Sequence, residues 1–398
     1  MRSIAIVGAT GSIGRQAVEV VRRHGDKLRL VAAAARSNWE GLWALLREFP
    51  LEAVALLDRE AAQALQKEVW KEGLSVEVLG GPEGLERVAG WPGAERVLSA
   101  AWGSLGLRTT LRALEAGKDV ALANKESLVV GGPLVKEALK ASGRRLIPVD
   151  SEHTALFQIL EGRKEEPKAL WLTASGGPFL GRHPSSLWKV TVEEALNHPT
   201  WRMGARITID SATLFNKGLE VMEAHHFFDM DYDRIHVVIH PQSYVHSMVE
   251  FSDGSFFAHV GMPDMRGAIQ YALSYPERWE APAAYPRPSE WPSFQFLPVD
   301  QELFPALSLC YKVGRMGHLA PAVMNGAKEE GVEAFLAGKL ALPYIAAVAG
   351  AAVKAYTRRD DLLQKPLTVE AVEEAVDFGR SFARFWMQDR SLLKEDML

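Results

Sequence analysis

The sequence predicts an α/β fold with three parts: an N-terminal Rossmann-like domain built on a parallel sheet, an α+β domain, and a C-terminal helical bundle. Short apolar runs alternate with helical patterns up to residue 149, and such alternation is typical of a parallel sheet with helices on both faces. A hairpin pattern appears later, and only helical patterns follow residue 300. We therefore place the domains at 1–149, 150–275 and 301–398, with a proline-rich linker at 276–300.

The N-terminal domain contains apolar runs of strand length, most of them separated from the next run by a helical pattern. The expected strands are Ile4–Val7, Leu28–Ala34, Ala53–Leu57, Val76–Leu79, Arg96–Ser99, Val120–Ala123 and Leu146–Val149. The expected helices are Ser12–His24, Trp39–Phe49, Glu60–Glu72, Ser104–Ala116 and Pro133–Ala141. In such a sheet ligands bind beyond the carboxyl ends of the strands, so functional residues are expected in the loops that follow the strands.

The second half of the chain predicts a hairpin and then a bundle. The alternating segments Tyr244–Phe251 and Phe256–Val260 surround Asp253-Gly254, a strong turn signal. We expect this hairpin in a sheet core or at a contact between two copies of the chain. The six prolines of residues 276–300 indicate a stiff extended segment. Helical patterns follow at Gln301–Lys312, Ala320–Glu330, Leu342–Tyr356 and Val369–Arg384.

The composition limits the class of partner. A formal net charge of -5 argues against nucleic acid, because proteins that follow a phosphate backbone concentrate basic residues. The apolar runs are too short for a secretion signal or a membrane span, and the single cysteine, Cys310, fits a reducing compartment. We expect a cytoplasmic protein that binds neither nucleic acid nor a membrane.

A glycine loop follows the first strand. Gly8-Ala9-Thr10-Gly11-Ser12-Ile13-Gly14 lies between an apolar strand and an apolar-periodic helix. Glycines allow the backbone to approach a pyrophosphate closely, and the helix N-terminus offers N–H donors and a positive dipole end. The spacing is GxxGxxG rather than GxGxxG. The loop predicts a dinucleotide site, and a purely structural turn is the alternative.

The end of the second strand favours NADP over NAD. NAD-binding folds usually place an acidic residue there for the ribose 2′-hydroxyl, whereas an arginine accommodates a 2′-phosphate. This strand ends in Arg36-Ser37-Asn38 and has no acidic residue before Glu40. The alternative is that Arg36 is only an exposed charge at a strand end.

Two carboxylates follow the last strand of the first domain. Asp150 and Glu152, in the string Asp150-Ser151-Glu152-His153, can converge on one hard cation, and Mg²⁺ or Mn²⁺ prefers oxygen ligands. Glu220 is the best candidate for a third carboxylate. The alternative for Asp150 is capping of a helix that continues through Leu160, with Glu152 in its first turn.

Polar loops further along the chain are suited to a phosphate. Ser175 begins a glycine loop that can present N–H groups to an anion, and Ser211, Asn216 and Lys217 add hydroxyl, amide and ammonium donors. Lys125, at another strand end, could contact cofactor or substrate. Each of these is also ordinary loop chemistry when taken alone.

The segment from His198 to Gly204 is typical of a lid, because a proline and a glycine flank apolar side chains that could exclude water. The alternative is a loop whose Trp201 packs on the core. Several other histidines show no zinc spacing and are expected to be structural: His225, His226, His236, His240 and His246.

Eight motifs occur in a fixed order between residue 8 and about residue 267: GATGSIG, LANKESLV, PVDSEH, TASGGPF, HPTWRMG, DSATLFNKGLE, HPQSYVHSMVEF and GMPDMR. Together they resemble the 1-deoxy-D-xylulose 5-phosphate reductoisomerase family of the non-mevalonate isoprenoid pathway. The helical tail matches the family's third domain in length and position. The sequence departs from many members at Arg36-Ser37, where glycine with lysine or serine is frequent, and at Thr200, often asparagine.

The resemblance implies roles for individual residues. The catalytic residues would be Lys125, Asp150, Glu152, His198 and Glu220, and those that bind Mg²⁺, Mn²⁺ or Co²⁺ would be Asp150, Glu152 and Glu220. Substrate would be bound by Lys125, Ser151, Glu152, Ser175, His198, Ser211, Asn216, Lys217 and Glu220. NADPH would be contacted by Thr10, Gly11, Ser12, Ile13, Arg36, Ser37, Asn38, Asn124, Glu126 and Gly204.

The resemblance also implies a homodimer, with the domain at 150–275 providing both the catalytic site and the dimer contact. The implied reaction converts a phosphosugar, 1-deoxy-D-xylulose 5-phosphate, to 2-C-methyl-D-erythritol 4-phosphate by rearrangement and hydride transfer. Two rivals remain: an NADP-dependent semialdehyde or homoserine dehydrogenase, and a non-catalytic NADP-sensing protein. A metal requirement and a rearranged product separate the reductoisomerase from the first, and turnover separates it from the second.

Overall fold

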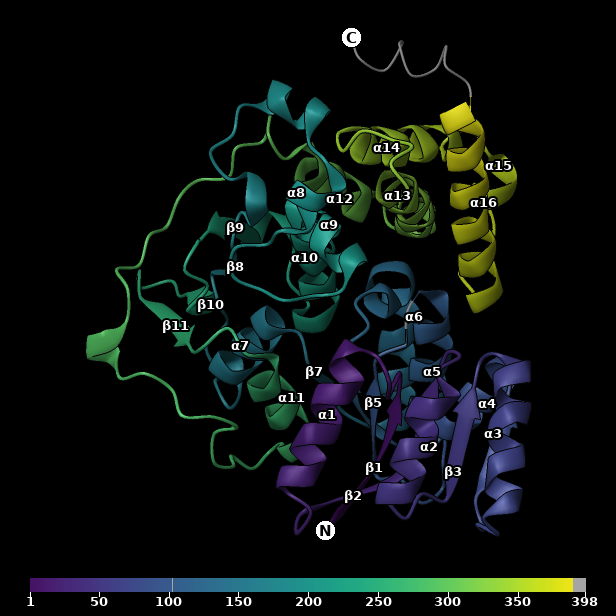
Figure 1. Ribbon diagram of the computed structural model, residues 1–398. Coiled ribbons are helices and arrows are strands. Elements are labelled where there is room, and N and C mark those ends of the chain that lie inside the picture. The colour runs from purple at the N-terminus through teal and green to yellow at the C-terminus, as the bar shows by residue number, and fades with distance from the viewer. Residues whose placement is uncertain (102, 389–398) are drawn as a thin grey trace. The chain divides into compact units, whose positions relative to one another are not determined.

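The structure is a computed structural model that describes residues 1–101 and 103–388 (Figure 1). The chain forms two compact units. Among the described residues, the first unit consists of those within 1–127, 133–157 and 264–285, and the second of those within 128–132, 158–263 and 286–388. The predicted domain boundaries at 149, 275 and 300 stay a prediction, because each compact unit is made of several separate stretches of the chain.

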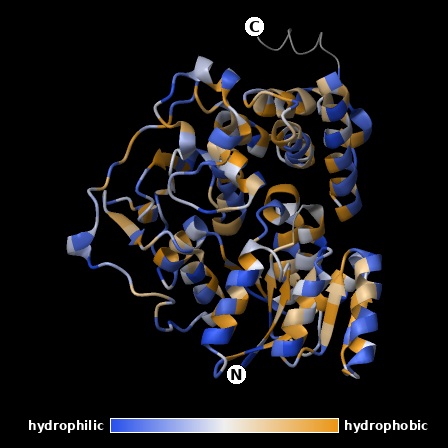
Figure 2. Cartoon of the chain, viewed as in Figure 1, coloured by the Kyte–Doolittle hydropathy of each residue, from blue (hydrophilic) through white to orange (hydrophobic). Residues whose placement is uncertain are grey.

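The first unit is built on a parallel sheet of seven strands in the order β4-β3-β2-β1-β5-β6-β7. The strands are β1 (Arg2–Val7), β2 (Leu28–Ala35), β3 (Ala53–Leu56), β4 (Glu77–Gly80), β5 (Arg96–Ser99), β6 (Asp119–Leu122) and β7 (Leu146–Pro148). Their inner positions are buried, as at Ile4, Ile6 and Val54, and Figure 2 shows hydrophobic residues concentrated on these strands. The predicted Rossmann-like parallel sheet is confirmed.

Eight helices of the described chain lie wholly or mainly in this unit. They are α1 (Ser12–Arg23), α2 (Trp39–Glu48), α3 (Arg59–Lys71), α4 (Pro82–Ala89), α5 (Ser104–Glu115), α6 (Glu126–Ser142), α7 (Ser151–Leu160) and α11 (Met265–Ser274). Helix α4 was not predicted from the sequence. The predicted start of α6 at Pro133 was wrong: the Asn124 side chain accepts a hydrogen bond from the Ser127 N–H, so the helix begins seven residues earlier, and it kinks at Gly131 before the proline.

Helix α11 returns to the first sheet from far along the chain, and two arginines fix its C-terminal end. Arg96, almost fully buried, donates to the carbonyl oxygens of Ala272 (2.8 Å) and Leu273 (3.0 Å). Arg2 donates to the same Leu273 oxygen at 2.6 Å. Cationic donors at a helix C-terminus satisfy its orphan carbonyls and favour its dipole.

The second unit contains a sheet of four strands in the order β11-β10-β8-β9. The strands are β8 (Ala169–Ala174), β9 (Ile235–Ile239), β10 (Val245–Glu250) and β11 (Phe256–Val260). Strand β10 is antiparallel to both β8 and β11, and β8 is parallel to β9. The predicted hairpin is therefore confirmed, with Glu250 paired to Phe256 across the turn.

The remaining helices of the second unit include the predicted C-terminal bundle. They are α8 (Val192–Leu196), α9 (Ala205–Ala212), α10 (Phe215–Phe228), α12 (Pro305–Met316), α13 (Ala320–Leu336), α14 (Tyr344–Tyr356), α15 (Asp360–Leu363) and α16 (Val369–Gln388). Short 3₁₀ turns occur at η1 (Gly177–Phe179), η2 (Pro184–Lys189), η3 (Tyr232–Arg234) and η4 (Pro288–Glu290). Helix α12 begins at Pro305 rather than at the predicted Gln301, because proline is favoured in the first helical turn. None of the described helices is long and apolar enough to cross a membrane.

The proline-rich segment packs against the first unit near one end and against the second unit near the other. Trp279 lies against His24 in the first unit, with ring centroids 4.7 Å apart. In the second unit, Leu297 forms a bridge to Ile239 at the end of β9. Each end of the segment is thus held by a compact unit.

Candidate active site

The glycine loop makes a tight turn that larger residues would not allow. Gly8 has φ +93°, and a Cβ atom there would lie 2.5 Å from the Ala100 carbonyl oxygen. At Gly14 a Cβ atom would lie 2.1 Å from the Gly8 oxygen. Helix α1 follows with no side-chain cap and no acidic residue in its first turn. Its N–H groups and positive dipole end therefore suit an anion such as a pyrophosphate.

The loop after β2 lies beside the glycine loop. A Cβ atom on Gly41 would lie 2.8 Å from both Thr10 Cγ2 and Asn38 Nδ2, so these two side chains share one small space. Asn38 caps α2 by accepting from the Gly41 N–H at 2.9 Å. Arg36 and Ser37 are exposed, and the Arg36 guanidinium has no hydrogen-bond partner in the part of the chain that the structure describes. It can therefore meet a phosphate without breaking an ion pair.

Strands β6 and β7 are neighbours, and their carboxyl ends bring Lys125 and Asp150 together. The Lys125 ammonium donates to Asp150 Oδ2, and both side chains are largely buried. The preceding Asn124 donates to Glu126 Oε2 at 2.7 Å. A Cβ atom on Gly106 would lie 2.2 Å from Asn124 Oδ1, so Gly106 allows α5 to approach this loop closely.

Asp150 combines the two interpretations that the sequence left open. Its Oδ1 accepts from the Glu152 N–H at 3.1 Å and the His153 N–H at 3.5 Å, which is helix capping of α7. Its Oδ2 meanwhile receives Lys125. Helix capping and a site role are thus compatible, because each uses a different oxygen.

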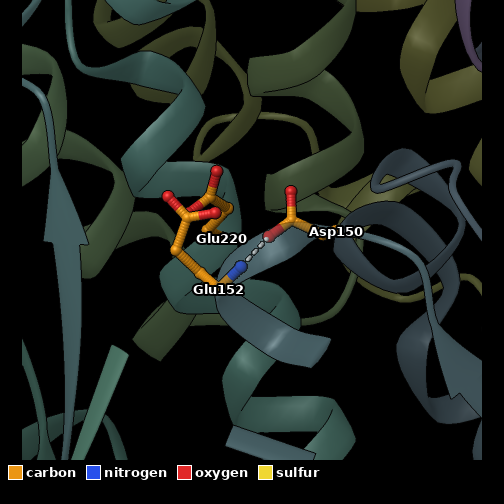
Figure 3. A group of neighbouring side chains, drawn as sticks. All are labelled: Asp150, Glu152 and Glu220. Atoms are coloured by element: carbon orange, nitrogen blue, oxygen red, sulfur yellow. Dashed lines mark hydrogen bonds between the residues drawn. The ribbon is translucent and has the colours of Figure 1, made fainter. Parts of the chain in front are cut away.

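Three carboxylates gather at one point. Ligand oxygens of Asp150, Glu152 and Glu220 all lie within 4.8 Å of one another, and Figure 3 shows the three groups turned toward a common space. Glu220 is only 1% exposed. On its own helix it accepts from Asn216 Nδ2 at 2.5 Å and from the Lys217 ammonium. A set of carboxylate oxygens this dense fits a hard divalent cation such as Mg²⁺ or Mn²⁺.

Ser175 and His198 form a defined hydrogen-bonded pair in the second unit. His198 Nδ1 accepts from the Thr200 N–H at 3.1 Å and the Trp201 N–H at 2.9 Å, so the ring proton is on Nε2. His198 Nε2 lies 3.0 Å from Ser175 Oγ. Burial lowers the pKa of His198, which keeps the ring neutral.

The Ser175 hydroxyl is oriented toward a further acceptor by these contacts. It accepts from His198 and, at 3.2 Å, from the Gly177 N–H, and it retains its own hydrogen for donation. Gly177 has φ +64°, and a Cβ atom there would lie 3.2 Å from the Ser211 carbonyl oxygen and from Ala212 Cα. The glycine loop and the end of α9 are therefore in close contact, which brings Ser175 and Ser211 into one region.

The contacts of the other predicted residues of the second unit do not by themselves indicate a role in binding. Gly204 caps α9 and is exposed. The Trp201 ring lies 6.5 Å from the His246 ring, and Trp201 is partly exposed, so the lid stays a prediction. His240 and His246 each contact a backbone carbonyl oxygen, those of Gln295 and Met262 respectively, as expected for structural histidines.

Sequence reasoning missed one charged residue close to these side chains. Lys328, on α13, is buried and forms an ion pair with Asp210, the residue before Ser211. The two lie 118 positions apart in the chain. No local pattern around Lys328 indicates this pairing.

Comparisons with known proteins agree along almost the whole chain. Three family models match: 1-deoxy-D-xylulose 5-phosphate reductoisomerase over residues 4–132, its C-terminal domain over 146–228, and the DXP reductoisomerase C-terminal domain over 260–382. A relative of that name from Heliobacterium modesticaldum is 46% identical, over 96% of this chain and 97% of its own. Another, from Geobacillus kaustophilus, is 49% identical, over 87% of this chain and 90% of its own.

Solved structures give the same result. A DOX-P reductoisomerase in complex with NADPH, fosmidomycin and magnesium has a TM-score of 0.92 and 38% identity, covering 99% of this chain and 100% of that one. The Zymomonas mobilis enzyme in complex with NADPH has a TM-score of 0.89 and 36% identity, covering 98% and 99%. The chain belongs to the 1-deoxy-D-xylulose 5-phosphate reductoisomerase family.

Proposed function

We propose that this chain converts 1-deoxy-D-xylulose 5-phosphate to 2-C-methyl-D-erythritol 4-phosphate in non-mevalonate isoprenoid biosynthesis, with NADPH and a divalent cation. The observation that supports this most strongly is the close approach of the Asp150, Glu152 and Glu220 carboxylates. Neither a simple NADP-dependent dehydrogenase nor an NADP sensor needs a cluster of three carboxylates. Family membership points to the same reaction.

The three carboxylates would hold Mg²⁺ or Mn²⁺, with Co²⁺ as a further possibility. When bound, the cation would act as a Lewis acid on the substrate's carbonyl and hydroxyl oxygens and hold them in one orientation. Glu220 is positioned for this by Asn216 and Lys217 on its own helix. Lys125, beside Asp150, would place its ammonium at the same end of the substrate, next to the reacting oxygens.

The phosphate of the substrate would be bound by Ser175, Ser211, Asn216 and Lys217, with His198 holding the Ser175 hydroxyl. Ser151 would contribute a further hydroxyl near Glu152. Contacts at a part of the substrate that does not react supply binding energy that orients the reacting carbons. We expect these residues to affect substrate affinity and turnover together.

NADPH would be bound along the carboxyl edge of the parallel sheet. The backbone of Thr10, Gly11, Ser12 and Ile13 would meet the pyrophosphate at the N-terminus of α1. The 2′-phosphate would lie at Arg36, Ser37 and Asn38, and further contacts would come from Asn124, Glu126 and Gly204. After the carbon skeleton rearranges by retro-aldol and aldol steps, a hydride from NADPH and one proton reduce the branched aldehyde to the alcohol.

The test is NADPH oxidation by the purified chain with the phosphosugar and Mg²⁺, followed by carbon NMR of the product. We expect turnover that stops with EDTA and returns with Mg²⁺, and a branched carbon skeleton in the product. Reduction without rearrangement would favour the dehydrogenase alternative. Binding of NADPH with no turnover would favour the sensor.

We also propose that the chain forms a homodimer through the edge strand β11. This strand pairs only with β10 among the described strands, and Phe256 and Phe257 are 52% and 43% exposed. An apolar edge strand is a ready template for a second copy. Light scattering should find a dimer for the wild type and a monomer for Phe256→Lys, and a monomeric wild type would refute the proposal. A cytoplasmic location is proposed as well, and cell fractionation tests it.

A further inference from the structure

We propose that Lys328 is a positioning residue for substrate binding, although it lies on α13 in the C-terminal bundle. Its buried ion pair with Asp210 would fix the helix that presents Ser211 and supports the Ser175 loop. This inference rests on the proposed function, because it assumes that these serines bind the phosphate of the substrate.

The ion pair is short and deeply buried. Lys328 Nζ lies 2.8 Å from Asp210 Oδ2, and the two residues are 3% and 8% exposed. The other oxygen of the carboxylate, Oδ1, has no hydrogen-bond partner among the described residues. Asp210 therefore depends on Lys328 for charge compensation at Oδ2, and loss of the ammonium would leave a buried carboxylate without that partner.

A buried ion pair is poor evidence for a purely stabilising role. Removing two charges from water costs several kcal/mol per ion, roughly offset by their attraction, and apolar replacements are often at least as stable. What such a pair does supply is a directional contact between two elements. Here it joins α9 to α13 at one position, with the donor and the acceptor both fixed on helices.

Helix α9 needs such a contact because it is short. It has eight residues, no side-chain cap at Gly204, and is too short to be stable by itself. It ends near Leu214, a residue with φ +56° that leads directly into α10. Its orientation is therefore set by the surfaces on which it packs rather than by its own sequence.

Helix α13 is a firm support for α9. Glu329, the residue after Lys328, accepts from Asn325 Nδ2 at 2.9 Å and from Arg380 of α16 at 2.7 Å. These side chains are buried or partly buried within the bundle. Lys328 is thus presented from a helix that is itself cross-linked to α16.

A movement of α9 would be transmitted to the serine loop. The loop and the helix end are in close contact, because a Cβ atom at Gly177 would lie 3.2 Å from the Ser211 oxygen and from Ala212 Cα. Gly177 in turn donates to Ser175 Oγ. The pair at Lys328 would therefore position both hydroxyl groups, from a distance and without contacting the ligand.

The test compares Lys328→Met, Asp210→Asn and the double variant with wild type. In Lys328→Met we expect KM for the phosphosugar to rise about tenfold, since displacement of binding groups by about 1 Å can cost up to about a hundredfold. KM for NADPH should rise much less, by no more than about threefold, because Gly204 is the only NADPH contact proposed on α9 and the others are proposed on the first unit. The double variant should recover most of the lost stability, because it removes the uncompensated charge together with its partner, but it should keep most of the rise in KM, because the contact between the two helices is still missing.

Glu333→Gln is the matched control. Glu333 pairs with Arg206 and also joins α13 to α9, but these side chains are 47% and 39% exposed, so its loss should leave both KM values unchanged. A lower melting temperature in Lys328→Met with unchanged KM for the phosphosugar would overturn the proposal and leave a structural pair only. If Lys328→Met does not fold, Asp210→Asn must still show the split between the two KM values, or the proposal fails.

Calorimetric titration with inorganic phosphate separates this inference from the proposed function. Wild type should bind phosphate more tightly than Lys328→Met, whichever phosphosugar is turned over. Equal affinities would contradict the positioning role even if the proposed reaction is correct. A wild-type chain that binds phosphate but does not rearrange the substrate would contradict the proposed function and not the role of Lys328.

Discussion

Replacing Arg36 tests how the chain selects NADPH. Arg36→Gln removes the cation but keeps a polar side chain at the end of β2. A hydrogen bond to a charged group contributes about 1.5–3 kcal/mol, and we take the low end because Arg36 is exposed. A loss of about 1.5 kcal/mol corresponds to roughly a tenfold rise in KM for NADPH. No compensating loss is expected, since the guanidinium has no other hydrogen-bond partner in the described residues.

The assay measures initial rates at saturating phosphosugar with NADPH and, separately, with NADH. KM for NADH should stay within about twofold, because NADH lacks the 2′-phosphate that Arg36 would contact. Arg47→Gln, an exposed arginine near the end of α2, is the control and should change neither value. An equal rise in both KM values would mean that the fold of the loop, not phosphate recognition, was lost. No change in either would refute the assignment of Arg36.

Three further changes test separate parts of the structure. Asp150→Asn should reduce turnover about a hundredfold or more, because asparagine has no charge for a cation, and should lower the free energy of unfolding by about 1–3 kcal/mol, because it keeps the cap of α7 but removes the buried partner of the Lys125 ammonium. Arg96→Leu should lower the free energy of unfolding by about 3 kcal/mol, since it leaves buried carbonyls at the end of α11 unsatisfied. As the pH falls through the lowered pKa of His198, KM for the phosphosugar should rise more in the wild type than in His198→Gln.

The pH dependence follows from the sign of the shift. The pKa of His198 is lowered by burial, so the folded site favours the neutral ring and its contribution to stability is complete above the unfolded value of 6.5. It is lost as the pH falls from that value toward the folded pKa, because the unfolded chain then binds a proton that the folded site does not. Below the folded pKa, protonation of Nδ1 displaces the two backbone donors. Glutamine keeps an N–H donor but does not titrate, so titration of the substrate phosphate alone remains in that variant.

Each of these predictions has a distinct failure. An Asp150→Asn variant with unchanged turnover would show that the carboxylate charge at this position is not needed for the reaction, and an unchanged free energy of unfolding would show that its pairing with Lys125 does not stabilise the fold. An unchanged denaturation midpoint in Arg96→Leu would mean that α11 docks without its arginines. Identical pH profiles for the wild type and His198→Gln would show that His198 does not titrate in this range.

The first sheet was predictable because its strands are apolar runs, most of them separated by amphipathic helices, a pattern that depends only on neighbouring residues. The hairpin was predictable for the same reason, from Asp253-Gly254. Helix α11 was not expected. It belongs to the first unit through hydrogen bonds from Arg96, 176 positions away from Ala272, and no local pattern indicates such a return.

The candidate site also contains residues whose position could be predicted from the sequence and residues whose position could not. Asp150, Glu152 and the glycine loop follow strands, where a parallel sheet places its ligands, so their position was open to prediction. Glu220 was identified as a third carboxylate by its type, and its approach to the other two depends on the tertiary fold. Helix capping and a role in the site were treated as alternatives for Asp150, but the carboxylate has two oxygens and can do both. The ion pair of Lys328 could not be predicted, because no pattern of neighbouring residues distinguishes a buried lysine from an exposed one.

The central claim is that three carboxylates of this chain bind a divalent cation. Titration with Mn²⁺, followed by electron paramagnetic resonance, measures this directly without turnover. We predict that the wild type binds Mn²⁺ and that Mg²⁺ competes for the site, whereas Glu220→Gln binds at least about tenfold more weakly because one of three anionic ligands is gone. Equal Mn²⁺ affinity in the wild type and in Glu220→Gln would contradict the account.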